Sequence, residues 1–269
     1  NATEDGAPEL LIKSDTHYNQ LGYDDNTITG TVIAAKTPGS YANGIRVSII
    51  DGKADQILTV TGISTVGMGV TQSVGNRVVA GAAGTSLLDG YLKGIVTGIP
   101  ETGKAEVKVL SHVSAAGTVT QVDYQANGVY CFKASEIITP SAAGSNVGTG
   151  STQVVSSQVD WFEQQEIVLT TKDGNGNPIK LEWDSLADAP GTSSYAQARG
   201  GRFDELHVVV IDDKGTITGN AGTILEKHLN LSKATDAEYS VGSTSYWRKY
   251  LANVSQYIYG GSAPAGITT

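Results

Sequence analysis

Short runs of β-branched and aromatic residues recur through residues 26–175, and turn-forming residues separate them. The clearest alternation of polar and apolar positions is Lys-Ala-Glu-Val-Lys-Val at residues 104–109, which is typical of a half-exposed strand. Dipeptides such as Asp51-Gly52 and Asn127-Gly128 mark the turns. The pattern predicts short strands at residues 27–35, 45–51, 56–64, 77–80, 90–97, 105–113, 119–125 and 129–134, with two more within 153–171.

Residues 176–269 follow a different pattern. Residues 179–183 and the continuous apolar run at 207–211 predict strands, the second one buried on both faces. Helices are expected at residues 222–231 and 243–255, because each segment places its large apolar side chains on one stripe. The stripes are Ile224, Leu225 and Leu229, and then Tyr246, Trp247, Tyr250, Leu251 and Val254, with Ser243 or Thr244 as the second N-cap. Residues 256–259 are expected to return as a strand.

These patterns together predict an α+β fold with several domains. Residues 1–25 form an acidic, irregular segment, in which Lys13 is the one basic residue. Residues 26–175 form a β-rich region, whose hairpin spacing suits a sandwich or a small barrel. Residues 176–269 form a small α/β unit.

The composition narrows the possible functions. The chain has 269 residues and a net charge of −9, so it is expected to repel phosphate backbones and not to bind nucleic acid in general. No apolar run approaches the ~20 residues that a membrane-spanning helix needs. The single cysteine, Cys131, lies in an apolar run and is expected to be a buried thiol without a disulfide partner in the chain.

Two loops approach known ligand-binding patterns. Residues 98–104 match a phosphate-binding loop through Lys104, but Ala105 stands where a magnesium-binding Ser or Thr is needed, and the next residues alternate like a strand. A hairpin turn is the favoured interpretation. Residues 173–177 begin like a calcium loop, with Asp184 at the twelfth position but Pro178 at the sixth, where Gly is needed. A polar turn is favoured there, and a weak calcium site stays an alternative.

Other chemical patterns do not predict a catalytic, cofactor or metal site. The four histidines lack metal-ligand spacing, and His207 is expected to be a packed residue of its strand. The acidic pair Asp212-Asp213 is expected to lie solvated in a turn. Near residues 199–205, Arg202 is expected either to pair with Asp204 or Glu205 or to form a salt bridge with another subunit.

Several segments resemble the tail sheath proteins of contractile-tailed bacteriophages, particularly those related to cyanobacterial myoviruses. The first is residues 35–51, a Pro-Gly and an Asn-Gly followed by a hydrophobic strand that ends in Asp51. A longer and more specific set comprises residues 184–195, 204–213, 222–226, 231–237 and 246–247, and residues 10–18 are also similar. The resemblance is weaker between residues 65 and 150. Because the family's N-terminal arm and C-terminal domain are missing, and the sequence begins with Asn1, a fragment is expected.

The resemblance implies a structural protein and not an enzyme. Sheath subunits form stacked hexameric rings around the tail tube, and their contraction drives the tube through the host envelope without nucleotide hydrolysis. Residues 26–175 would then be a protruding region and residues 176–269 part of the sheath core. The expected partners are neighbouring subunits, with the tube and baseplate contacted through the missing parts. The expected location is the virion tail, assembled in the host bacterial cytoplasm, without membrane insertion.

Arg202, Asp204, Glu205 and Lys249 are the candidate subunit-interface residues, and the fragment alone is expected to be monomeric. The alternative function is a β-rich attachment domain of a virion, similar to an adhesin or tail fibre. A phosphate-using or virion-bound hydrolase is a third and weaker hypothesis.

Overall fold

A computed structural model describes residues 12, 14–20, 32–37, 39–54, 56–59, 76–81, 91–98, 104–114, 116–121, 137–138, 151–158 and 160–261. Strands in small sheets dominate these ranges and helices are few, which confirms the β-rich character predicted from the sequence. No helix in the described ranges is long and apolar enough to cross a membrane. The chain divides into two compact units. Unit 1 is Asn1–Gly52, Ile167–Leu181 and Ala187–Thr269, and unit 2 is Lys53–Glu166 and Glu182–Leu186.

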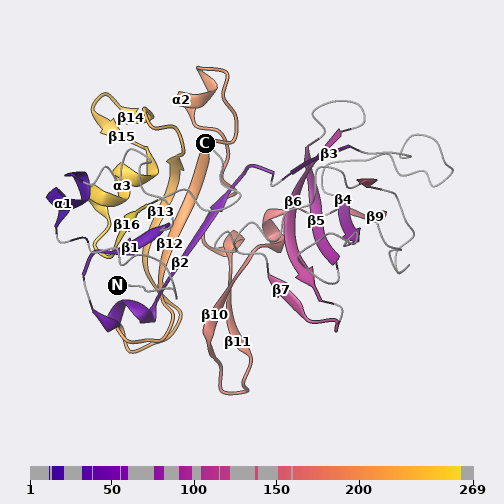
Figure 1. Cartoon of the computed structure of the whole chain (residues 1–269), viewed down its shortest axis with the longest axis horizontal. Helices are drawn as coiled ribbons and strands as arrows, with labels where there is room; N and C mark the ends of the chain where they lie inside the picture. Colours follow the sequence, from indigo (N-terminus) through magenta and orange to yellow (C-terminus); the bar gives the residue numbers. More distant parts are fainter. Residues whose placement is uncertain are drawn as a thin grey trace. The chain divides into compact units, whose positions relative to one another are not determined.

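The centre of unit 1 is a three-stranded antiparallel sheet with the order β13-β12-β2 (Figure 1). Its strands are β2 (Ile45–Asp51), β12 (Glu205–Asp212) and β13 (Thr223–Ser232). In β12, Leu206 and the run from Val208 to Ile211 are completely buried, as the continuous apolar run predicted. Because β2 pairs with β12, residues 45–51 belong to the same unit as residues 205–232, although most of unit 2 lies between them in the sequence.

The helix predicted at residues 222–231 is wrong, because this segment is β13. Its pairing with β12 runs from Glu205 opposite Ser232 to Asp212 opposite Thr223, with two register shifts. A fully buried strand needs partners for its backbone N–H and C=O groups on both sides, and β13 supplies them on one side. This tertiary requirement outweighs the weak helical stripe of three apolar residues.

Helix α3 (Trp247–Val254) confirms the helix predicted at residues 243–255, but it begins later than expected. Its N-cap is Tyr246, which makes no side-chain cap, so the predicted cap at Ser243 or Thr244 is wrong. Those two residues form β15 (Ser243–Thr244), which pairs with β14 (Glu238–Ser240). Trp247 and Leu251 bury the apolar face of α3.

The ends of unit 1 are fastened together by short elements (Figure 1). β1 (Ile33–Ala35) pairs antiparallel with β16 (Ile258–Gly260), which confirms the predicted return strand. Helix α1 (Asp15–Gln20) places Tyr18 in a stack on Tyr259, with ring centroids 4.6 Å apart. Unit 1 also holds most of the hairpin of β10 (Glu166–Lys172) and β11 (Pro178–Glu182), and the short helix α2 (Ser194–Gln197).

The described strands of unit 2 form one sheet of seven strands, with the order β3-β6-β5-β4-β9-β8 and with β7 also paired to β6. All the pairings are antiparallel except that of β8 with β9. The strands are β3 (Gln56–Thr59), β4 (Asn76–Gly81), β5 (Tyr91–Gly98), β6 (Lys104–Val113), β7 (Val119–Gln121), β8 (Ile137–Ile138) and β9 (Ser151–Gln158). The strand predicted at 129–134, with Cys131, lies outside the described residues.

A buried lysine joins two parts of unit 2 that are far apart in the sequence. Lys108 of β6 is 1% exposed, and its Nζ donates a hydrogen bond of 2.9 Å to the carbonyl oxygen of Lys53. The same Nζ lies 5.6 Å from the centre of the Trp161 ring. Lys108 therefore holds residue 53, where the chain enters unit 2, close to residue 161, just before it leaves.

Candidate functional site

The four candidate interface residues divide into two exposed bases and two acids engaged within the chain. Arg202 and Lys249 are exposed, and in the described part of the chain neither forms an ion pair with Asp204 or Glu205. Asp204 is buried, and Glu205 is half-buried at the start of β12. The structure therefore leaves Arg202 and Lys249 accessible and places the two acids in internal hydrogen bonds.

Asp204 and Glu205 fix the segment before α2. The Asp204 carboxylate accepts hydrogen bonds from the Ser193 N–H at 2.8 Å, the Ser193 hydroxyl at 2.7 Å and the Ser232 hydroxyl at 2.5 Å. Glu205 Oε2 accepts from the Gly191 N–H at 2.9 Å. Ser193 in turn caps α2 by accepting from the N–H of Ala196. The two acids thus connect β12 to the end of β13 and to the start of α2.

The acidic pair at the end of β12 is buried, so the prediction that it is solvated is wrong. Asp212 is 0% exposed, and its carboxylate accepts from the N–H groups of Thr216, Ile217 and Thr218 at 2.9, 2.9 and 2.7 Å. Burial alone would raise the pKa of Asp212, but these hydrogen bonds lower it below its ordinary value. Asp213 accepts from the N–H of Thr170 in β10 at 2.7 Å. The sequence did contain a sign of these hydrogen bonds, since Asp212 ends a strand directly before a turn rich in Gly and Thr.

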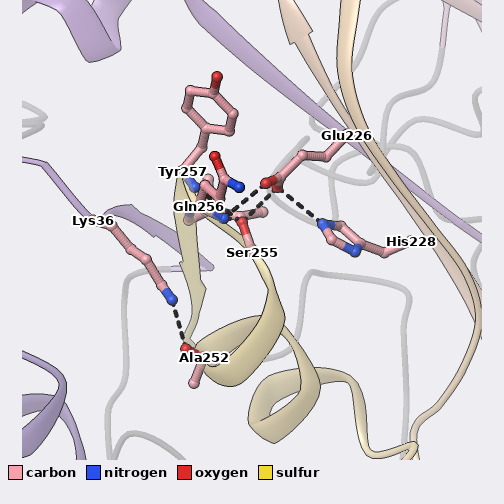
Figure 2. Close-up of polar contacts among 8 residues, drawn as sticks. Lys36, Glu226, His228, Ala252, Ser255, Gln256 and Tyr257 are labelled. Carbon is pink, nitrogen blue, oxygen red and sulfur yellow. Dashed lines mark hydrogen bonds and ion pairs between the residues drawn. The ribbon is translucent and has the colours of Figure 1, made fainter.

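A second carboxylate cluster was missed by the sequence analysis. It consists of Glu226 and His228 of β13 with Ser255 and Gln256, which follow α3, and we call it the Glu226 cluster (Figure 2). Glu226 accepts from the Ser255 hydroxyl at 2.6 Å and from the Gln256 N–H at 2.7 Å, and it contacts His228 Nε2 at 3.0 Å. Burial raises the pKa of Glu226, but these three contacts lower it overall.

The geometry of the Glu226 cluster suits a contact that holds the residues after α3 to β13, and it does not suit nucleophilic catalysis. In a catalytic triad the serine hydroxyl bonds to the histidine, whereas here the serine and the histidine both bond to the carboxylate. The Ser255 oxygen also accepts from the N–H groups of Tyr257 and Ile258. Glu226 and His228 could be recognised as neighbours on one strand face only if residues 222–231 were a strand, and the sequence pattern favoured a helix there.

Lys36 lies beside the same cluster and secures the end of α3 (Figure 2). Its Nζ donates to the carbonyl oxygen of Ala252 at 2.5 Å and lies 4.7 Å from the centre of the Tyr259 ring. Burial lowers the pKa of Lys36, while the charges of Asp15 and Glu226 act in the opposite direction. A cation at the last carbonyls of a helix also complements the helix dipole.

His207 is a packed residue, as predicted. It is 1% exposed, and its Nδ1 accepts from the N–H of Asn230 at 3.0 Å. Its Nε2 lies 2.9 Å from the carbonyl oxygen of Asp188. The neutral ring with its proton on Nε2 satisfies both contacts, so this histidine connects three segments of unit 1.

The two loops that resemble ligand-binding patterns have structural explanations. β5 ends at Gly98 and pairs antiparallel with β6, which begins at Lys104, so the predicted hairpin is confirmed and no helix follows the lysine. In the turn after β10, Asp173 Oδ1 accepts from the N–H groups of Asn175 and Asn177 at 2.9 and 2.8 Å. Across the described ranges, no three His, Cys, Asp or Glu side chains gather as a metal site would require.

No protein-family model, curated protein or solved structure gives a match to this chain. A functional proposal therefore depends on the residues that carry the sequence resemblance and on where the structure places them.

Proposed function

We propose that this chain is part of a structural subunit of a contractile phage tail sheath. The observation that carries the proposal is the location of the resembling segments. Residues 35–51 contain β2, residues 204–213 contain β12, and these two strands pair residue by residue from Leu206 opposite Asp51 to Asp212 opposite Ile45. Residues 222–226 begin β13 on the other side of β12. Segments far apart in the sequence that carry one resemblance thus form one sheet, which a chance similarity would not require.

In this proposal the two units have separate roles. Unit 1 is the α/β portion of the sheath core, and unit 2 is the β-rich protruding domain. Subunits assemble as stacked hexameric rings around the tail tube and contract together, so the partners are other copies of the subunit, with the tube and baseplate reached through further parts of the protein. No nucleotide, metal or catalytic residue takes part, and the assembly belongs to the virion tail.

Three buried or half-buried carboxylates of unit 1 support a mechanical function. Asp204, Asp212 and Glu226 each accept several hydrogen bonds that join loops and helices to the β12 sheet. Buried polar networks of this kind make a fold rigid when their members are satisfied. A rigid unit suits a subunit that moves as a body while its contacts with neighbours change.

The test is to express a longer version of the gene, with arm and C-terminal domain, and to image the product by negative-stain electron microscopy beside residues 1–269. Hollow tubes from the long chain and monomers from residues 1–269 are the expected result. Discrete trimers, or binding to cells without tubes, would contradict the proposal and favour the attachment domain.

Charge reversals at the exposed candidate residues refine this test. Arg202→Glu and Lys249→Glu are expected to shorten or abolish the tubes without lowering the melting temperature of residues 1–269, since both side chains are exposed. Lys172→Glu on the exposed part of β10 is the charge-matched control, expected to leave tubes intact. Normal tubes from both reversals would remove these residues from the interface.

A further inference from the structure

Asp51 and Lys233 form a deeply buried pair between the two outer strands of the unit 1 sheet. Lys233 Nζ lies 2.9 Å from Asp51 Oδ2, and the side chains are 5% and 0% exposed. Asp51 ends β2, and Lys233 directly follows β13, so the pair spans β12. The N–H of Lys233 donates to the carbonyl oxygen of Asp204 at 2.8 Å, which fixes the backbone from which the lysine extends.

Burial on this scale disfavours two separate charges. Moving a carboxylate and an ammonium group out of water has a free-energy cost that their attraction does not always offset. Transfer of one proton from the ammonium to the carboxylate within this contact gives an uncharged acid and an uncharged amine. These are the forms that condense to an amide, and the fixed contact raises their effective concentration, by up to about 10⁵–10⁸ M in well-oriented pairs. Exclusion of water also slows the reverse hydrolysis.

We propose that Asp51 and Lys233 become joined by an intramolecular amide bond. Lys233 Nζ attacks the Asp51 side-chain carbon, the new C–N bond forms, and one carboxylate oxygen leaves as water. One proton first passes from the ammonium to the carboxylate; the uncharged amine then attacks, and the hydroxyl of the acid leaves with one proton of the nitrogen, so carboxylate and ammonium become one amide and one water. No oxidant, metal or other reactant is needed. The product is uncharged, and it ties β2 to the end of β13 across 182 residues of sequence.

The cross-link goes beyond the proposed function and does not depend on it. It would close a covalent loop formed by the chain from residue 51 to residue 233, which contains β12. Such a loop limits the freedom of the unfolded chain. It would also keep the outer strands of the sheet from separating under load, because force along the chain would pass through the amide.

The test is the intact mass of the purified 269-residue chain under denaturing conditions. The expected mass is lower than that of the sequence by one water molecule, and a protease digest is expected to yield a branched peptide joining the segments around residues 51 and 233. Lys233→Met and Asp51→Ala are expected to show their full calculated masses. Lys249→Met, which changes an exposed lysine, is expected to keep the deficit.

A wild-type mass equal to that of the full sequence overturns the proposal, and the pair is then an ion pair only. A deficit located in any other peptide also overturns it. Because the decisive measurement uses the denatured wild-type chain, the result stands even where a variant fails to fold.

Discussion

Unit 1 and unit 2 use buried polar groups in different ways. In unit 1, the carboxylates of Asp204, Asp212 and Glu226 accept hydrogen bonds from N–H and O–H groups of the loops and helices around β12. In unit 2, the most deeply buried charged side chain among the described residues is Lys108, which donates to a backbone carbonyl. The polar contacts described in unit 1 therefore have mainly carboxylate acceptors, with Lys233 as a buried donor to Asp51, whereas in unit 2 the buried group is the donor Lys108.

The two units also differ in how far apart in the sequence their paired strands lie. In unit 2, β4, β5, β6 and β7 pair in the order in which they occur along the chain. In unit 1, β12 pairs with β2, more than 150 residues earlier in the sequence. Pairs that are remote in sequence have a larger loop-closure cost than hairpins. The carboxylates of unit 1 offset part of this cost, so unit 1 should be more sensitive to the loss of a single polar group.

The largest expected effect is that of Asp212→Ala. The substitution leaves three backbone N–H groups of the turn without their acceptor, at a cost of about 3 kcal/mol or more in the free energy of unfolding. Trp247 lies in unit 1, while Trp161 and Trp183 lie in unit 2. Urea unfolding followed by Trp247 fluorescence, in a background with Trp161→Phe and Trp183→Phe, therefore measures the loss in unit 1.

Asp173→Ala is the matched control for Asp212→Ala. Asp173 accepts backbone hydrogen bonds in the same manner, but in an exposed hairpin turn where water can replace it. A much smaller change is expected. Equal losses at the two positions would show that burial of the carboxylate is not what makes unit 1 sensitive.

The next largest effect is expected in unit 2, from Lys108→Met. Methionine keeps most of the length and the apolar contacts of the side chain but removes the charged donor to the Lys53 carbonyl, a loss of about 1.5–3 kcal/mol. In a Trp247→Phe background, Trp161 and Trp183 report this loss. The unit 1 signal, measured separately through Trp247, should not move. If both signals shift together, the units unfold as one, and the comparison between them fails.

The sequence predicted the hairpins of unit 2 and the buried strand of unit 1 for local reasons. In β6 polar and apolar residues alternate, and a turn was predicted between β5 and β6. The apolar run of β12 can be identified without its partners. β13 could not be identified in this way. Its assignment depends on the need of β12 for a partner, which local periodicity does not record.

The candidate site was less predictable than the fold, because its members become neighbours only through the remote pairing. Glu226 and His228 share a strand face, and Ser255 lies about thirty residues away, just after α3. Asp204 was singled out for its charge, but its partners Ser193 and Ser232 come from two other segments. Asp204 and Asp212 were singled out by residue type and Glu226 was not, and the sequence alone did not show that these side chains make internal hydrogen bonds.

A smaller effect is expected from Glu226→Gln, which keeps the size of the side chain and removes the charge. The expected cost at neutral pH is about 1–2 kcal/mol, because the contacts from Ser255, Gln256 and His228 lose a charged acceptor. The folded-state pKa of Glu226 is lowered from 4.5, so its contribution is present above that value and is lost as the pH falls through the folded pKa. Urea midpoints at successively lower pH should therefore show the two proteins converging. Glu238→Gln on exposed β14 serves as the control, and a gap that stays constant into acid would refute the assignment.

The smallest expected effect is that of Tyr259→Phe, which keeps the stack on Tyr18 but removes the hydrogen bond from the Tyr259 hydroxyl to Asp15. The expected cost is about 1 kcal/mol. Burial, and then the contact with Asp15, raises the pKa of Tyr259 from 10.0 to about 12, so this part of the stability is present below pH 10 and is lost as the pH rises toward 12. The ultraviolet absorbance of tyrosinate measures this directly.

Tyr239, whose pKa burial also raises to about 12, should ionise in the same late step. Tyr259→Phe and Tyr239→Phe should each remove part of the late step. Asp15→Asn should move the Tyr259 part of that step to lower pH, and it should have no such effect in a Tyr259→Phe background. If the late step keeps its full amplitude in Tyr259→Phe, the hydroxyl is already ionised at lower pH, and the contact between α1 and β16 then depends on the ring stack alone.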